Sequence, residues 1–307
     1  MRSVLHIVTK GQACSGMHLV LAAGNPGSTE IRKIGQEAVE MGLTAILGEQ
    51  EASGIEVPRI TLWANSAVDA LGVERGGWVE WALRWLHAHG RRSIVRTRHV
   101  LARSLVDAIA EMGVGVELEI AHQRARVQRA LLDRFADPAS ALLLQSQNLA
   151  SRKIPVWARV APLLPGIHDQ ETDKSGFEAL VRNLIAADLH DATLEVGVLH
   201  AQQIFALHEA VGPGGLSAGG LLKLGRFFGL DPVSLLSERP ARTTVFQMRR
   251  YSATALAHEL TRVATRIGLR TNHCGCSTQC HLWPSAAPSA PYLSVVGPDL
   301  FAGQLTG

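Results

Sequence analysis

Three of the chain's four cysteines lie in one seven-residue stretch near the end of the sequence. Cys274, Cys276 and Cys280 form the pattern Cys-x-Cys-x3-Cys, with His273 directly before them and His281 directly after. Thiolates are soft ligands for iron–sulfur clusters and for zinc. The spacing is tighter than in zinc ribbons and differs from that of ferredoxins. We interpret the stretch as a metal site, with unligated thiols in a mobile tail as the alternative.

Composition limits the possible classes of function. The 307 residues are 47% hydrophobic and 19% charged, with a net charge of +3, which is ordinary for a soluble globular enzyme. The small net charge and the few aromatic residues do not point to nucleic acid. The first apolar run is too short for a signal sequence, and no segment has eighteen consecutive apolar residues. We expect a cytoplasmic protein without a membrane span, in which clustered cysteines serve metal or redox chemistry rather than disulfides.

Strand-like and helix-like segments alternate along most of the sequence. Strands are predicted at residues 4–8, 58–63, 93–97, 114–120, 155–160, 192–199 and 269–272, and helices at 30–41, 78–87, 102–112, 123–151, 176–187 and 252–267. Residues 10–29 are predicted to be mostly loop, and Gly42 is predicted to stop the first helix.

This alternation indicates parallel strands joined by helical crossovers, hence an α/β fold that is a full or partial (β/α) barrel. Residues 1–282 would form the barrel, with the cysteine cluster at its C-terminal end. Residues 283–307 are rich in Pro, Ser and Ala and are expected to be poorly ordered. The chain has no glycine-rich dinucleotide fingerprint in a strand–helix context and no P-loop sequence.

The predicted barrel suggests where a site would form, because (β/α) barrels place their sites at the carboxyl ends of the strands. Asn65 follows the second predicted strand and is the leading polar residue of such a pocket. The three clustered cysteines follow the last strand, and Cys14 follows the first. If the barrel closes or nearly closes, first and last strands are neighbours and all four thiols could meet.

Charged residues inside the predicted strands form a second group of candidates. Glu117 and Glu119 alternate along one strand and therefore share a face. A buried carboxylate pair is costly unless it is paired or catalytic. Arg96 and Arg159, on neighbouring strands, are possible partners, and structural ion pairing and substrate anchoring both remain open. Two histidines near strand ends are further candidates for the pocket. His168 is expected in a polar turn, and His200 is the better candidate of the two.

Four segments resemble the radical S-adenosylmethionine (SAM) barrel of the spore photoproduct lyase-like group. Residues 154–169, Ile-Pro-Val-Trp-Ala-Arg-Val-Ala-Pro-Leu-Leu-Pro-Gly-Ile-His-Asp, are similar to that group's fifth-strand pattern. Residues 94–105 are similar to its Thr-Lys strand–helix junction, residues 60–66 to its Asn-Thr-Asp turn, and residues 114–120 take the place of its fourth strand. The resemblance covers roughly residues 58–200.

The resemblance also has departures. Radical SAM enzymes hold a [4Fe-4S] cluster with Cys-x3-Cys-x2-Cys after the first strand. In this sequence the same spacing from Cys14 gives His18 and Leu21, so two of the three thiols are missing, and Ala67 stands where the group has an Asp. The resemblance thus implies the barrel scaffold without its usual cluster loop.

Together, the cysteine cluster and the resemblance predict a radical-SAM-like iron–sulfur enzyme of the lyase or transferase type. Cys274, Cys276 and Cys280 would hold a [4Fe-4S] cluster with one iron open for SAM or a small-molecule substrate, and Asn65 would contact the cofactor. Alternatively Cys14 or a histidine completes a closed zinc site. In that case the protein is a non-catalytic barrel, a scaffold or partner-binding protein with structural zinc or no metal. The sequence does not indicate the oligomeric state.

Overall fold

The computed structural model describes most of the chain. The described residues are 5–13, 16–23, 35–55, 57, 59–75, 77–169, 176–196, 199–213, 215–229, 245–246 and 248–271. Within these ranges, none of the helices has the length and apolar character that crossing a membrane requires.

An eight-stranded sheet organises the described part of the chain. Its strands follow the order β1-β2-β3-β4-β5-β6-β7-β10: β1 (Leu5–Ala13), β2 (Gly16–Ala23), β3 (Arg59–Ala64), β4 (Ser93–Thr97), β5 (Gly115–Glu119), β6 (Val156–Leu163), β7 (Asp191–Val196) and β10 (Arg270–Thr271). The hairpin β1–β2 is antiparallel, and every other neighbouring pair is parallel. In the described part of the chain β1 and β10 are the two edges. The expected barrel is therefore partial, and its first and last strands are not neighbours.

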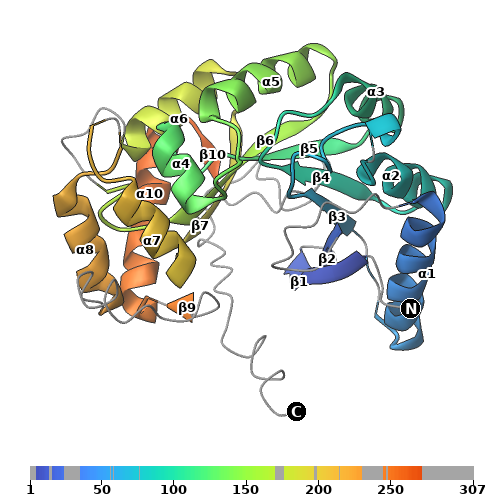
Figure 1. Ribbon diagram of the computed structural model, residues 1–307, viewed down its shortest axis with the longest axis horizontal. Coiled ribbons are helices and arrows are strands. Elements are labelled where there is room, and N and C mark those ends of the chain that lie inside the picture. Colours follow the sequence, from blue (N-terminus) through green and yellow to red (C-terminus); the bar gives the residue numbers. More distant parts are fainter. Residues whose placement is uncertain are drawn as a thin grey trace.

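Six helices cover one face of this sheet. They are α1 (Gln36–Ala52), α2 (Val79–Ala88), α3 (Arg103–Glu111), α5 (Ala139–Ser151), α6 (Phe177–Ala186) and α10 (Arg250–Ile267). Figure 1 shows the strands along the inner side of an arc and these helices along its outer side. The main hydrophobic core lies between the two layers, because it combines residues of the sheet with the inward-facing leucines of the helices.

A smaller cluster of apolar residues joins the remaining helices at one end of the arc. It contains side chains of α4 (Ala125–Leu131), α7 (Ala201–Glu209) and α8 (Ala218–Phe228). A two-stranded sheet, β8 (Leu199–His200) with β9 (Val245–Phe246), lies beside α7. A short 3-10 helix, η1 (Val73–Arg75), precedes α2.

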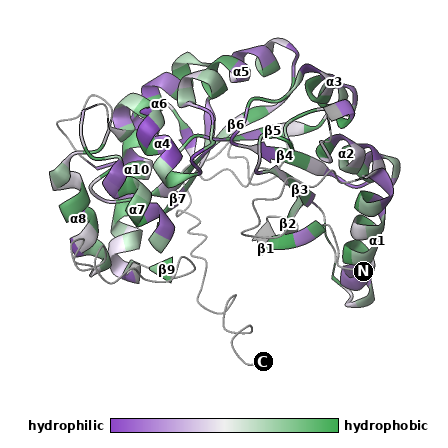
Figure 2. Cartoon of the chain, in the orientation of Figure 1, coloured by the Kyte–Doolittle hydropathy of each residue, from purple (hydrophilic) through white to green (hydrophobic). Residues whose placement is uncertain are grey.

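The strands alternate between an apolar face and a polar face. In β5, Val116 and Leu118 belong to the core between sheet and helices, so Glu117 and Glu119 lie on the inner face. Hydrophilic stretches accordingly interrupt the hydrophobic colour of the central strands in Figure 2. The inner face of a closed barrel would be packed with side chains, whereas this open sheet can carry charged groups there.

Two sequence-based predictions near the N-terminus are wrong. Residues 16–23 form β2 rather than a loop, because Leu19 and Leu21 are fully buried in the core. Helix α1 continues through Gly42 to Ala52. A Cβ atom added at Gly42 would lie 3.3 Å from the side chain of Leu5, so this glycine allows α1 to pack closely on β1 and does not stop the helix.

Candidate functional site

Six charged side chains form a continuous ladder on the inner face of the sheet. Cross-strand register places Arg96 of β4 beside Glu117 of β5, and Glu119 beside Arg159 of β6. Arg98, just past the end of β4, and Glu195 of β7 complete the set. We call these residues, Arg96, Arg98, Glu117, Glu119, Arg159 and Glu195, the charged ladder.

Glu117 is buried and is paired with side chains from both neighbouring strands. It accepts a hydrogen bond from Arg96 Nε, and its Oε1 accepts one from Trp157 Nε1 at 3.1 Å. Burial by itself would raise the pKa of Glu117, but the guanidinium groups of Arg96 and Arg159, with these hydrogen bonds, lower it to about 2. Glu117 is therefore ionised throughout the neutral range.

Glu119 is held in the same way, by residues on two other strands. Its Oε2 accepts hydrogen bonds from Arg98 Nε at 3.0 Å and from Trp63 Nε1 at 3.0 Å. Arg98 also donates to the carbonyl of Leu132 at 2.9 Å and lies over the Trp63 ring, 4.8 Å from its centroid. Burial opposes ionisation of Glu119, yet the nearby arginines keep its pKa below the usual value.

Arg159 completes the pairing through an ion pair with Glu195 of β7. Burial would lower the pKa of Arg159, but the carboxylates of Glu195, Glu117 and Glu119 raise it instead. Three guanidinium groups thus face three carboxylates. The ladder can orient a polar ligand through fixed charges, but it is poorly suited to general acid or base catalysis, because its environment lowers the pKa of Glu117 and Glu119 and raises the pKa of Arg159.

The predicted pairing of the β5 carboxylates with Arg96 and Arg159 is therefore confirmed for Arg96. Sequence reasoning missed Arg98, Glu195 and the indole donors Trp63 and Trp157. A signal was available, because Arg98 lies two residues after Arg96 and so shares its face. Indole donors that reach across a neighbouring strand have no comparable signature in the sequence.

Asn65 lies at the carboxyl end of β3, as the sequence predicts. Its backbone N–H donates to the carbonyl of Trp63 at 3.0 Å. The turn that follows is fixed by two hydrogen bonds: Ser66 N–H to Asp69 Oδ2 at 3.0 Å, and Asp69 N–H to Ser66 Oγ at 3.3 Å. Burial raises the pKa of Asp69. The role of Asn65 in cofactor binding stays a prediction.

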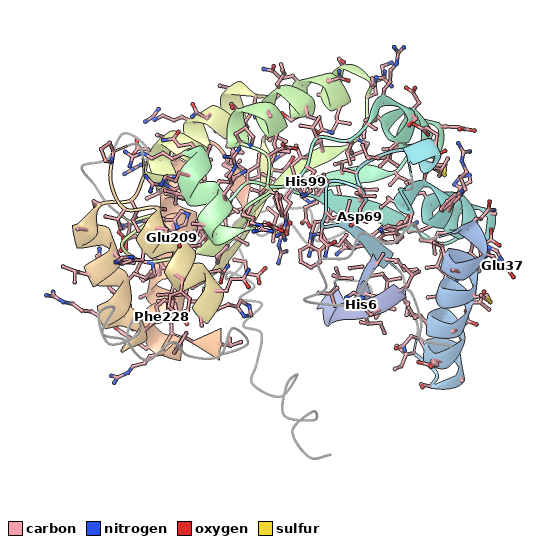
Figure 3. The ribbon with its side chains drawn as sticks, in the orientation of Figure 1. His6, Glu37, Asp69, His99, Glu209 and Phe228 are labelled. Carbon is pink, nitrogen blue, oxygen red and sulfur yellow. The ribbon has the colours of Figure 1, made fainter. Side chains whose placement is uncertain are left out.

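His99 is a buried histidine at the carboxyl edge that sequence reasoning did not single out. It follows Arg98, is 2% exposed and lies in the middle of the arc (Figure 3). The backbone N–H of His99 donates to Thr97 Oγ1 at 2.9 Å, and His99 Nδ1 is 3.8 Å from Asp137 Oδ2. Burial lowers the pKa of His99 despite the opposing carboxylate of Asp137.

The two histidine candidates from the sequence, His168 and His200, have different surroundings. His168 is buried, its Nδ1 accepts the backbone N–H of Leu164 at 3.0 Å, and its Nε2 donates to the carbonyl of Ala121 at 2.8 Å. Both ring nitrogens are therefore used in fixing the turn, as expected for a structural residue. His200 is exposed and is the N-cap of α7, where its backbone N–H donates to Gln203 Oε1 at 2.8 Å. Its role in a pocket stays a prediction.

The predicted metal ligands Cys14, Cys274, Cys276 and Cys280 all lie outside the described residues. Within the described ranges, no group of three or more His, Cys, Asp or Glu side chains could hold a metal ion. The residues on either side of the Cys14 segment, Ala13 and Gly16, pair with each other at the amino end of β2. Because residues 16–23 form a strand, the spacing from Cys14 to Leu21 does not correspond to a cluster-binding loop.

Comparison with known proteins gives structural similarity alone. No family model and no curated protein matches the chain. Streptococcus suis SuiB bound to S-adenosylmethionine is 10% identical with a TM-score of 0.39, covering 55% of this chain and 35% of that chain. Spore photoproduct lyase complexed with dinucleoside spore photoproduct is 16% identical with a TM-score of 0.46, and the match covers 78% of this chain and 66% of that chain. The archaeal Methanocaldococcus infernus Elp3 is 11% identical with a TM-score of 0.44, and the match covers 76% of this chain and 51% of that chain.

The chain thus spans about a third of the length of SuiB and less than two thirds of the Elp3 chain. At these identities and TM-scores the similarity does not identify a function for this chain.

Proposed function

We propose that the chain is a radical-SAM-like iron–sulfur enzyme acting on a small molecule. In this proposal Cys274, Cys276 and Cys280 bind a [4Fe-4S] cluster, one iron of which stays open for SAM. Cys14 as a fourth ligand would instead close the site. Both cofactors and a cytoplasmic location, where thiols stay reduced, belong to the proposal.

The observation that carries the proposal is the direction in which the chain leaves β10. Thr271 is paired in parallel with Ala192 of β7, and Cys274 follows three residues later in the sequence. Three residues span at most about 11 Å. The cysteines therefore follow the strand that leads toward the carboxyl edge of the sheet.

The chemistry of the donor set fits an iron–sulfur cluster. Three thiolates can bind three irons, and soft sulfur ligands favour this cluster over hard cations such as Mg²⁺. The carboxylates of the charged ladder do not compete for the metal, because Glu117, Glu119 and Glu195 are each paired with an arginine. The bound cluster would supply the one-electron chemistry that starts a radical reaction from SAM.

The described residues would orient the reactants and leave the chemistry to the cofactor. The charged ladder offers fixed, oppositely charged groups on a rigid sheet, which can hold a polar substrate in one orientation. Asn65, at the carboxyl end of β3, would add an uncharged polar contact. His168 is bonded at both ring nitrogens, so it would keep its structural role in this proposal.

The alternative is a non-catalytic barrel with structural zinc or no metal. The observation that favours it is the complete pairing of the charged ladder, since a fully matched network can serve stability and specificity alone. A closed zinc site would bind the C-terminal segment to the sheet without supplying chemistry.

Anaerobic purification with iron, sulfide and zinc analysis tests the proposal. We expect a brown protein with about four irons per chain, and slow cleavage of SAM after chemical reduction. Cys276→Ala should lose the iron, whereas Glu49→Gln, on the outer helix α1, should retain it. A colourless protein that binds one zinc or no metal and never cleaves SAM would contradict the proposal and favour the non-catalytic barrel.

A further inference from the structure

A groove on the outer surface, between α1 and α2, has features that the proposed reaction does not use. It has a volume of about 380 Å³, and its walls include Glu40, Glu80, Trp81, Arg84 and Trp85. A second hollow of about 430 Å³ continues along α1 and shares Glu40 and Trp85 with the first. We call the two hollows together the α1–α2 groove. It lies on the helix-covered side of the sheet, whereas the charged ladder lies on the other (Figure 1).

The apolar part of the groove consists of two tryptophans on one face of α2 and of Met41 on α1. Trp81 and Trp85 lie four residues apart and so share a face of α2, and both are only partly buried. Each packs against the main core on one side and lines the groove on the other. The Trp85 ring stacks on His89 with the centroids 3.8 Å apart. Met41, 45% exposed, extends the apolar surface along α1.

The polar part of the groove is acidic. Its lining contains three carboxylates, Glu37, Glu40 and Glu80, against one guanidinium group, that of Arg84. Glu37 lies on the outer side of α1 (Figure 3). An acidic groove stands out on a chain whose net charge is +3, and it would attract positively charged partners.

Arg84 balances the charge of Glu80, so the acidic character of the groove rests on Glu37 and Glu40. Arg84 Nε and Nη2 donate to Glu80 Oε1 at 3.2 and 3.1 Å, and Arg84 Nη1 lies 3.6 Å from Glu111 Oε2. The second carboxylate oxygen, Glu80 Oε2, is buried and accepts no hydrogen bond from any described residue.

We propose that the α1–α2 groove is a docking site for a partner protein's peptide segment that carries Lys or Arg among apolar residues. The argument is charge complementarity combined with aromatic surface. Guanidinium and ammonium groups are attracted to indole faces and to carboxylates, and Trp81, Trp85, Glu37 and Glu40 present both within one groove. Apolar residues of the segment would contact Met41 and the indole edges.

The test uses the full chain and a defined probe. The probe is a fluorescein-labelled peptide of Leu-Arg-Ala-Lys repeated three times, and its control has Glu at every basic position. Fluorescence anisotropy should show binding of the basic peptide alone, weakening as salt is added. The double variant Glu37→Gln/Glu40→Gln should bind roughly fivefold to tenfold more weakly. Glu49→Gln, an exposed carboxylate of α1 outside the groove lining, is the matched control and should bind like the unchanged chain.

Two results would overturn this assignment. One is equal binding of the basic peptide by the unchanged chain and by Glu37→Gln/Glu40→Gln. The other is a dimer in analytical ultracentrifugation that the double variant converts to a monomer, since the occupant would then be a second copy of this chain. Trp85→Ala provides an independent check, provided that its circular dichroism spectrum is unchanged: it should also weaken binding of the basic peptide.

Discussion

Trp63 and Glu119 are joined across an intervening strand. Trp63 belongs to β3 and Glu119 to β5, yet Trp63 Nε1 donates to Glu119 Oε2 at 3.0 Å. Arg98, at the end of the intervening β4, donates to the same oxygen at 3.0 Å and lies over the Trp63 ring. One carboxylate therefore ties three parallel strands together at the carboxyl edge of the sheet.

Replacing that carboxylate should destabilise the fold strongly. Glu119→Gln leaves the Arg98 guanidinium buried without its counter-charge, and both side chains are at most 10% exposed. Removing one partner of a buried ion pair costs about 3–5 kcal/mol in the free energy of unfolding. Urea unfolding at neutral pH measures the loss.

A double replacement separates the two contributions to that loss. Arg98→Met/Glu119→Leu removes both charges, so the Trp63 N–H loses its acceptor, at a cost of about 1–3 kcal/mol, and the Leu132 carbonyl, which is only partly buried, loses its donor. We expect the double variant to be more stable than Glu119→Gln. If it were less stable, the ion pair itself would contribute a net stabilisation that the desolvation argument does not allow.

The indole donors should each contribute measurably. Trp63→Phe and Trp157→Phe keep an aromatic ring but remove a hydrogen bond to an ionised carboxylate, which is worth about 1.5–3 kcal/mol. Trp85→Phe on the outer helix is the control and should change the free energy of unfolding by about 0.5 kcal/mol or less. Equal effects of all three substitutions would show that ring size, rather than the hydrogen bond, determines the loss.

The low pKa of Glu117 predicts an acid limb in the stability profile. In the folded chain its pKa is about 2 against 4.5 for the unperturbed group. Between these values the unfolded chain binds a proton that the folded chain does not, so stability falls as pH falls from 4.5 toward 2. The full contribution is roughly 3 kcal/mol. Unfolding free energies measured from pH 6 to pH 3 should show a shallower limb for Glu117→Gln than for the unchanged chain.

The sheet could be predicted from the sequence where the strands are long and bounded by turn residues. The strands at 93–97 and 114–120, and helix ends at Gly90, Gly113 and Gly268, agree with the structure, because each of these glycines takes a positive φ. The sequence predicts a loop in place of β2 because residues 10–29 are rich in Gly and Ser, which are typical of loops. Only the contact of α1 with β1 explains why Gly42 lies inside a helix.

The candidate site was only half predictable. Alternation identified the face shared by Glu117 and Glu119, and neighbouring strands suggested Arg96 as a partner. Whether the sheet closes depends on strand tilt and stagger, which local sequence does not encode. Because the sheet stays open in the described part of the chain, β1 and β10 form its two edges.

His168 predicts a second, milder pH effect. Burial lowers its pKa below 6.5, although hydrogen bonds with the backbone of Ala121 and Leu164 oppose the shift. The unfolded chain therefore binds a proton below pH 6.5 that the folded chain excludes, and stability falls as pH decreases from 6.5. His168→Gln should reduce the difference in unfolding free energy between pH 7.5 and pH 5.5, and His87→Gln, at an exposed position, is the matched control. Burial also lowers the pKa of His99, so part of the pH dependence of the unfolding free energy should remain in His168→Gln.

The position of β2 predicts how the two cysteine-bearing segments differ in metal binding. Ala13 and Gly16 flank the Cys14 segment at the amino end of β2, and a strand of seven further residues carries the chain roughly 23 Å to Ala23 at the carboxyl edge. A cluster at that edge would be out of reach of a thiol at the opposite end. We therefore expect Cys14→Ala to retain the iron of the unchanged chain, and Cys274→Ala, Cys276→Ala and Cys280→Ala to lose it. Iron and sulfide analysis after anaerobic reconstitution measures both. Loss of metal from Cys14→Ala, with its circular dichroism spectrum unchanged, would instead establish a four-thiol site and reject the open-iron proposal.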